Sequence, residues 1–468
     1  MAAGQIAFQS SEGQYAYEGV AKLVNSYAEK RGPDAKAPLS IVPSDGIIEL
    51  TDDPTGPIRG MIFLEDLDKL YTIHSSSAWK HTWNGSALTS TRIGTVPGID
   101  QVQLSRNQNA SPQTAVRTDS GVQFIASDSL AYSSDTDFPD DVVTADYVGG
   151  YHAYGLTDRQ FFISSLNEAK TIDPLDFATF EQRSGKLLRI VEHAGEMVGF
   201  CSSWMEYWRD TGNADFPFEP IGFKSRGLRA ANSVVRSDNT LMFVGDDAII
   251  YRLNNYDPLR ISTHSIERLI NDDTSSDDMI GFSWTHDGHA FSNWTGTSFS
   301  RCYDAATGVW HSRESYGSTT WRAKYSVPAW NMVIVGDSTT GKLGYLDRHT
   351  YTEFGDPIIW GVDSPPLHVF PNGGIVDALH LDLATGYGLL SGQGSDPKIM
   401  LQVSKDGGNT FGQYRELSLG VTGKYATRVT ARNLGEFGPK GIVFRLRISD
   451  PVARGLVATD VEIRPLKR

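Results

Sequence analysis

Residues 197–212 have the sequence MVGFCSSWMEYWRDTG. A short apolar segment leads into a turn of small polar residues, and a second segment follows in which aromatic residues recur. Two such segments joined by a short polar turn predict a β-hairpin. Similar units, each an apolar core followed by a tyrosine, recur at Met61–Tyr71, Val122–Tyr132, Leu241–Tyr251, Ala290–Tyr303 and Met332–Tyr345, with a weaker copy at Phe161.

The spacing of these units predicts the fold class. From residue 122 onward they begin 36 to 49 residues apart, close to the roughly 40–50 residues of one four-stranded propeller blade. The sequence therefore predicts an all-β protein whose residues 58–363 form a β-propeller of six or seven blades. The polar stretch 103–113 is interpreted as a surface loop that lengthens the interval between the first two units.

The sequence before and after the repeated units does not show their pattern. Residues 1–57 lack the pattern and are interpreted as an extended N-terminal arm. From residue 364 the predicted strands are longer and alternate apolar with polar residues, which indicates a C-terminal β-sandwich-like unit over 364–468 that could also lend a strand to the propeller. One helix is expected, over 263–270, with Thr263 as its N-cap.

Composition excludes several classes of protein. The net charge of −14 argues against general nucleic-acid binding, which depends on Lys and Arg, although an acidic protein could surround DNA without holding it. Cys201 and Cys302 lie in apolar segments and are expected to be buried free thiols. The acidic runs 133–141 and 271–278 are interpreted as solvated loops. Neither a signal peptide nor a membrane-spanning segment is indicated, so synthesis in a cytoplasm is expected.

One stretch matches an enzyme-associated signature, the Asp-box of sialidase propellers. Its role there is structural, because Ser404 and Asp406 would bind backbone amides and the glycines would permit positive φ. The expected structural turn comprises Ser404, Asp406, Gly407, Gly408, Thr410 and Phe411.

Catalysis would require further groups. A sialidase needs an arginine cluster and a Tyr/Glu nucleophile pair, and arginines 183, 189, 209, 226 and 229 could converge in a propeller. Nucleophile-elbow, phosphate-loop and metal-binding motifs are missing from the sequence. Structural roles are expected for His74, His81, His286, His289 and His311. We therefore expect no catalytic residue, cofactor or metal.

Four sets of residues resemble the packaged-DNA stabilisation protein, or tail hub, of short-tailed phages related to the Salmonella podovirus. The sets are Leu23-Val24-Asn25 with Pro43, Gly46-Ile47, Arg59-Gly60 and Tyr71; Phe200, Ser203, Glu206-Tyr207 and Thr211-Gly212; Ser265-Ile266-Glu267 and Ile270; and Asp406-Gly407, Phe411-Gly412, Phe444-Arg445-Leu446-Arg447 and Val461–Ile463. They follow the family's order along nearly the whole chain.

The resemblance implies a non-enzymatic virion protein of the phage tail, made in the host bacterial cytoplasm. It implies a homohexameric ring beneath the portal and adaptor that forms the DNA exit channel, retains packaged DNA, and docks tailspikes or fibres and a plug or needle. Double-stranded DNA would pass without sequence-specific binding. The arm before residue 58 and the loops 103–113 and 133–141 are the expected contact surfaces. The alternatives are a sialidase-like carbohydrate-active propeller and a non-catalytic protein-binding propeller.

Overall fold

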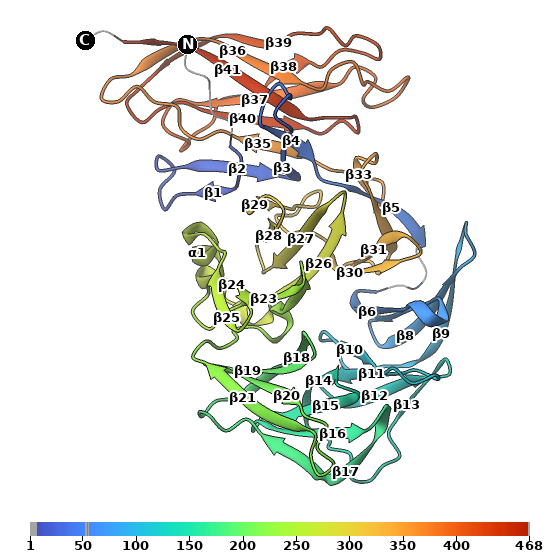
Figure 1. Cartoon of the computed structure of the whole chain (residues 1–468). Helices are drawn as coiled ribbons and strands as arrows, with labels where there is room; N and C mark the ends of the chain where they lie inside the picture. The colour runs from blue at the N-terminus through green and yellow to red at the C-terminus, as the bar shows by residue number, and fades with distance from the viewer. Residues whose placement is uncertain (1–6, 52–53, 55, 467–468) are drawn as a thin grey trace.

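A seven-bladed β-propeller and a β-sandwich make up the molecule (Figure 1). The computed structural model describes residues 7–51, 54 and 56–466. Within this part of the chain the only α-helix is α1 (His264–Asp272). The predicted all-β propeller with a C-terminal sandwich is confirmed, and the number of blades is seven.

Five blades are four-stranded sheets made from consecutive strands. Blade 1 contains β6 (Ile58–Leu64), β7 (Lys69–His74), β8 (Ser77–Trp83) and β9 (Leu88–Thr95). Blade 2 contains β10 (Gln103–Arg106), β11 (Gln113–Thr118), β12 (Gly121–Ala126) and β13 (Ser129–Tyr132). Blade 3 contains β14 (Val142–Val148), β15 (Tyr151–Leu156), β16 (Gln160–Ser165) and β17 (Glu168–Thr179). Blade 4 contains β18 (Leu187–His193), β19 (Glu196–Cys201), β20 (Met205–Asp210) and β21 (Phe218–Lys224), and blade 5 contains β22 (Val235–Ser237), β23 (Thr240–Val244), β24 (Ile250–Asn254) and β25 (Asp257–Arg260).

The last two blades connect to the N-terminal segment. Blade 6 contains β26 (Ile280–His286), β27 (His289–Thr295), β28 (Ser300–Asp304) and β29 (Val309–Ser312). Blade 7 contains β30 (Ala323–Ala329), β31 (Met332–Asp337) and β32 (Leu343–Asp347), and its fourth strand is β5 (Gly46–Thr51). The short β33 (Thr352–Glu353) and β34 (Asp356–Pro357) extend that sheet. The ring is therefore closed by a strand from the segment interpreted as an arm.

The innermost strands begin 39 to 48 residues apart, which explains the spacing of the sequence units. The hairpin at 197–212 is formed by β19 and β20. A β-bulge at the start of the innermost strand recurs in blades 1, 3, 4 and 7, where Arg59, Val143, Leu188 and Lys324 are the extra residues. Bulges re-aim side chains and increase local twist.

The interpretation of residues 103–113 as a surface loop is wrong for residues 103–106, whereas residues 107–112 form the loop between β10 and β11. Residues 103–106 form the innermost strand of blade 2, and Gln103 and Asn107 are buried. The Thr144 hydroxyl donates a hydrogen bond to the Gln103 side chain at 3.0 Å, and the Ile190 amide donates to Thr144 at 3.0 Å. Polar residues are buried here because they bond neighbouring blades to one another, which a hydropathy pattern does not distinguish from exposure.

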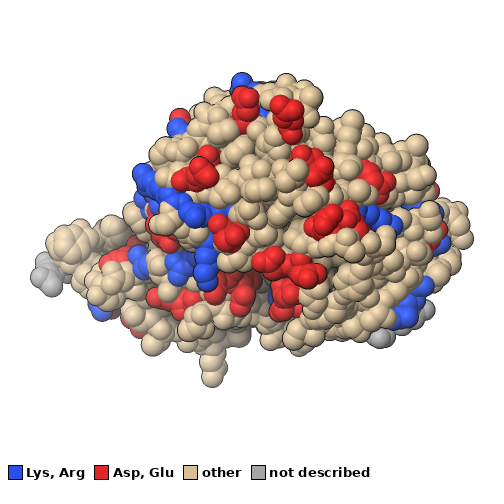
Figure 2. All heavy atoms as spheres, turned by 90° about the horizontal axis from the view of Figure 1, so that it is seen from below, with Lys and Arg blue, Asp and Glu red and all other residues tan. Residues whose placement is uncertain are grey.

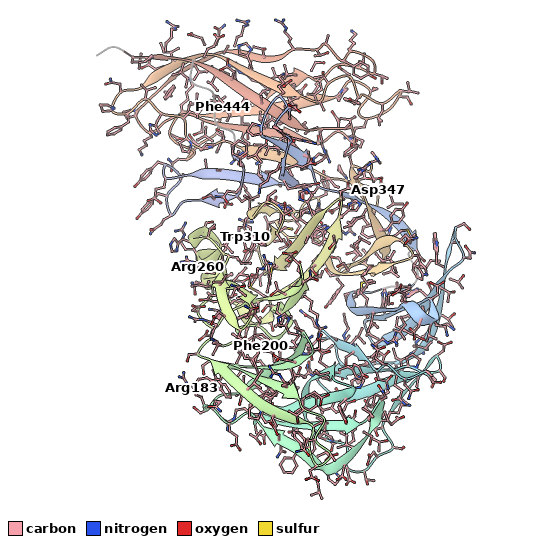
Figure 3. The ribbon with its side chains drawn as sticks, in the orientation of Figure 1. Arg183, Phe200, Arg260, Trp310, Asp347 and Phe444 are labelled. Atoms are coloured by element: carbon pink, nitrogen blue, oxygen red, sulfur yellow. The ribbon has the colours of Figure 1, made fainter. Side chains whose placement is uncertain are left out.

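The sandwich is built from both ends of the chain. One layer contains β1 (Ser11–Glu12), β2 (Val20–Val24), β35 (Trp360–Asp363), β40 (Val443–Ile448), β37 (Lys398–Ser404) and β38 (Arg415–Ser418). The other contains β3 (Ser26–Lys30), β4 (Leu39–Pro43), β41 (Leu456–Pro465), β36 (Gly374–Leu383) and β39 (Val429–Phe437). Their facing apolar side chains, including Leu23, Trp360, Leu401 and Phe444, form one core (Figure 3).

A continuous sheet joins the two parts. β2 pairs with β35 in the sandwich and, in parallel through Val24 and Ser312, with β29 at the outer edge of blade 6. The sandwich consequently lies against the rim of the propeller beside blades 6 and 7 (Figure 1). Backbone hydrogen bonds cross this junction, since the amides of Ser10 and Asn25 donate to the carbonyls of Trp310 and Ser312, each at 2.8 Å.

Candidate functional site

The Asp-box stretch forms a hydrogen-bonded turn between β37 and β38, in the sandwich and outside the propeller blades. The Ser404 hydroxyl donates to Asp406 Oδ1 at 2.6 Å, and the Gly408 amide donates to Ser404 Oγ at 2.8 Å. The Thr410 amide and hydroxyl donate to the two oxygens of Asp406 at 3.0 and 2.7 Å. Gly407 and Gly408 adopt φ of 75° and 98°. Hydrogen bonds from Ser404 and Thr410 lower the pKa of Asp406 to about 2.

The side chains around this turn hold it in place. The Arg445 guanidinium lies 3.7 Å from the centroid of the Phe411 ring, and Arg445 also pairs with Asp363 at 3.1 Å. A Cβ at Gly408 would lie 2.8 Å from a methyl group of Val20, so the turn packs against β2. The turn thus fastens the sandwich to the N-terminal strands, and every polar contact of Asp406 is internal to it.

The five arginines considered for a carboxylate site are dispersed. Arg183 lies over the Phe223 ring on the outside of blade 4 (Figure 3). Arg209 pairs with Glu196 at 2.9 Å, Arg226 with Asp246 at 3.0 Å, and Arg229 donates to Ser276 at 2.8 Å. Arg189 lies on β18, where burial lowers its pKa to about 10. These five arginines therefore do not form the cluster that the sialidase-like alternative requires.

The histidines and cysteines have packing roles. Burial lowers the pKa of His74 to about 4 and that of His81 to about 3, and Thr72 bonds to both rings. His289 pairs with Asp304 at 2.8 Å, and this hydrogen bond raises the pKa of the imidazole. The expectation that Cys201 and Cys302 are buried free thiols is confirmed.

Sequence reasoning missed the polar cluster that joins the propeller to the sandwich. Asn25, between β2 and β3, adopts a φ of 49°. Its amide donates to the carbonyls of Glu314 and Ile359 at 2.8 and 3.0 Å, and its oxygen accepts the Glu314 amide at 2.9 Å. Asparagine tolerates the left-handed conformation better than most residues, so an asparagine between two predicted strands could have indicated a turn at this position.

A buried ion pair lies in the same cluster. Arg313 and Glu353, each 2% exposed, approach within 3.5 Å. Burial raises the pKa of Glu353, whose oxygens also accept hydrogen bonds from Ser315 at 2.7 Å and Trp321 at 2.8 Å. Arg313 stacks 4.1 Å from the centroid of the Trp321 ring. Breaking such a pair is costly, so it holds the segment that follows β29 of blade 6 against β33 of the blade 7 sheet.

Acidic residues outnumber basic ones in the chain, with 56 Asp and Glu against 42 Lys and Arg. Figure 2 shows Asp and Glu spread over the lower face, with Lys and Arg in smaller groups. Within the described residues, no three His, Cys, Asp or Glu side chains are arranged to hold a metal ion. None of the described helices has the length and hydropathy of a membrane span.

Comparisons with known proteins match both parts of the chain. The model of the bacteriophage P22 Gp10 β-propeller matches residues 23–351, and that of the Gp10 β-sandwich matches residues 359–464. No curated protein matches the sequence.

Solved structures resemble the chain only distantly. The WD40 propeller domain of Doa1 is 9% identical with a TM-score of 0.41, over 65% of this chain and 96% of that one. The extracellular domain of the putative one-component system BT4673 from B. thetaiotaomicron is 9% identical with a TM-score of 0.45, over 86% of this chain and 58% of that one. The designed Ika8 protein is 10% identical with a TM-score of 0.38, over 63% and 84%.

Proposed function

Because the chain belongs to the bacteriophage P22 Gp10 family of phage structural proteins that stabilise packaged DNA, we propose that it is a tail-hub, or nozzle, subunit of a short-tailed phage. The observation that carries this proposal is that both family models match, in order, along nearly the whole chain. Six copies would form a ring beneath the portal and adaptor. The ring would conduct DNA outward, hold a plug or needle, and dock tailspikes or fibres.

The charge of the molecule suits a DNA channel. A net charge of −14 gives walls that repel the phosphate backbone, so DNA slides through without sequence-specific binding. Retention then depends on closure by the plug rather than on affinity for DNA.

An exposed apolar surface on the sandwich is the contact that we assign to the neighbouring copy in the ring. Leu390 is 93% exposed and Tyr425 is 64% exposed, and Tyr387, Leu389 and Val421 lie on the same two loops. The loops are held together, because the Thr385 hydroxyl donates to the Tyr425 carbonyl at 2.9 Å and the Tyr387 and Tyr425 rings meet at 5.6 Å. Exposed apolar groups fixed in one geometry are typical of protein interfaces. The strands β2 to β5 of the expected contact arm pair within the chain, and contact of this arm with another copy stays a prediction.

The test is retention of DNA in filled heads that carry portal and adaptor but lack this protein. Added protein should protect the packaged DNA from nuclease. Leu390→Asp should abolish protection by preventing ring formation, whereas Leu175→Asp, which changes a leucine on blade 3 that is 81% exposed, should leave it intact. Unchanged nuclease sensitivity with the unaltered protein would contradict the proposal.

A further inference from the structure

A cavity of about 660 Å³ opens between blades 1, 6 and 7. It lies where the innermost strands turn back, and its lining includes Phe63, Glu65, Asp68, His286, Trp330 and Tyr345. Aromatic faces and carboxylates therefore share one opening at the seam where the ring closes.

Trp330 occupies an unusual backbone position. Trp330 and Asn331 form the two-residue turn between β30 and β31, with φ of 53° and 59°. The equivalent turns of blades 3 to 6 are Gly149-Gly150, Ala194-Gly195, Asp238-Asn239 and Asp287-Gly288, all with positive φ. Such turns favour Gly, Asn and Asp, and a bulky residue at positive φ is strained. Blade 7 alone among these five places a large aromatic ring there.

Neighbouring groups fix the orientation of that ring. The Trp330 indole nitrogen donates to Asp68 Oδ1 at 2.6 Å, across the seam from blade 7 to blade 1. The ring meets Phe63 edge-on at a centroid distance of 5.3 Å, and the Trp83 ring lies 6.3 Å away. The indole is consequently held as part of the cavity wall.

Within the part of the chain that the structure describes, the carboxylates at the cavity have no cationic partner. Among residues 7–51, 54 and 56–466, neither Glu65 nor Asp68 forms an ion pair, and both are exposed. His286 also lines the cavity, and its Nδ1 atom lies 2.8 Å from a carboxylate oxygen of Asp45.

A second cavity on the same side of the ring provides a comparison. It measures about 880 Å³, lies between blades 4 and 5, and is lined by Glu196 and Asp238. There Arg209 pairs with Glu196 at 2.9 Å and Arg252 pairs with Asp238 at 2.9 Å. Among the described residues, arginines thus pair with the acidic groups of the cavity between blades 4 and 5. None pairs with Glu65 or Asp68 in the cavity between blades 1, 6 and 7.

We propose that the cavity between blades 1, 6 and 7 binds an arginine or lysine side chain of a partner protein. The aliphatic stem would pack on Phe63, Met332 and Tyr345, and the charged end would lie over the Trp330 ring between Glu65 and Asp68. Cations are attracted to aromatic faces, and the acidic surface raises the local concentration of basic segments. A neutral sugar would leave two carboxylates without a countercharge, so the charge favours the basic side chain.

The experiment follows the indole N–H signal of Trp330 by NMR in full-length protein labelled with ¹⁵N-tryptophan, with Trp330→Phe used for assignment. The probes are the capped tripeptides Gly-Arg-Gly and Gly-Glu-Gly and the neutral sugar maltotriose. We expect a saturable shift with the arginine peptide only, weakened by salt. Glu65→Gln should weaken binding by about 3-fold and the Glu65→Gln/Asp68→Asn pair by about 10-fold, consistent with the modest energies of exposed charge pairs.

Asp215→Asn is the matched control, because it removes one negative charge from an exposed loop of blade 4 that does not line the cavity. It should leave the arginine-peptide titration unchanged. A Trp330 signal that does not move with the arginine peptide, moves equally with the glutamate peptide, or moves with maltotriose alone would overturn the proposal. These measurements use the isolated protein and need no other phage component, so they are independent of the tail-hub assignment.

Discussion

Glu206 is a carboxyl group on β20 that is only 2% exposed. Burial, as the main cause, raises its pKa from 4.5 to about 7. The folded protein therefore holds a proton that the unfolded chain releases at lower pH. The stabilisation due to this proton is complete below about pH 4.5 and is lost as the pH rises through about 7, and it amounts to about 3 kcal/mol for a shift of this size.

We predict that Glu206→Gln removes this pH dependence. Glu206 should lower the free energy of unfolding of the unaltered protein at pH 8 relative to pH 5. The variant should lack this decrease, and urea denaturation at both pH values measures it. Glu219→Gln, at an exposed site on β21, should retain the decrease. If Glu206→Gln shifts the free energy of unfolding equally at both pH values, the buried-acid interpretation is wrong.

Asn25 is the second residue whose role can be measured. Asn25→Ala removes three hydrogen bonds and places alanine at a φ of 49°, and we expect a loss of about 3 kcal/mol of stability. Asn25→Gly removes the same bonds but tolerates the conformation, so it should be about 1 kcal/mol less destabilising. Equal losses for the two variants, measured by thermal unfolding, would show that backbone strain has no part.

Single residues were predictable where their local context decided their role. The apolar segments around Cys201 and Cys302 were enough to expect buried thiols, and the Ser-x-Asp-x-Gly spacing was enough to expect a turn. Arg313 and Glu353 could not be predicted, because they are 40 positions apart in the sequence and their burial depends on a junction made by distant strands.

At the scale of elements, β5 closes blade 7 by pairing with β32. Ile47 is 1% exposed and packs with Val335 and Leu346. We predict that Ile47→Asp destabilises the protein by about 4 kcal/mol, since it buries a charge in an apolar core. Hydrogen exchange of the β32 amides should increase.

The control for β5 is Glu49→Gln on the same strand. It removes only a surface pair with Lys342 and should cost less than about 1 kcal/mol. Unchanged exchange in β32 after Ile47→Asp would contradict closure of the ring by β5.

Elements with strong local patterns were predictable, and those defined by distant partners were not. The helix expected over 263–270 occurs as α1 at His264–Asp272. Thr263 precedes it as expected, but its hydroxyl contacts Ser265 rather than a backbone amide. Residues 103–106 were misinterpreted as part of a loop, because buried polar residues that bond neighbouring blades resemble solvated ones in sequence. Closure by β5 could not be seen, since its partner β32 lies almost 300 positions away.

At the scale of the whole molecule, the N-terminal strands unite the propeller with the sandwich. β2 lies between β29 of blade 6 and β35 of the sandwich in one continuous sheet. β3 and β4 complete the second layer of the sandwich, and β5 completes blade 7. The spacing of 36 to 49 residues between the sequence units predicted the propeller, because each blade is local in sequence. The sandwich contains strands from both ends of the chain, and no local pattern reveals such pairing.

The most direct test of the tail-hub proposal is the mass of the assembly formed with an isolated portal–adaptor complex, measured by light scattering and followed by negative-stain imaging. The account predicts that six copies join the complex end-on around a central channel and that Leu390→Asp prevents their addition. A protein that remains separate from the complex at every salt concentration would contradict it.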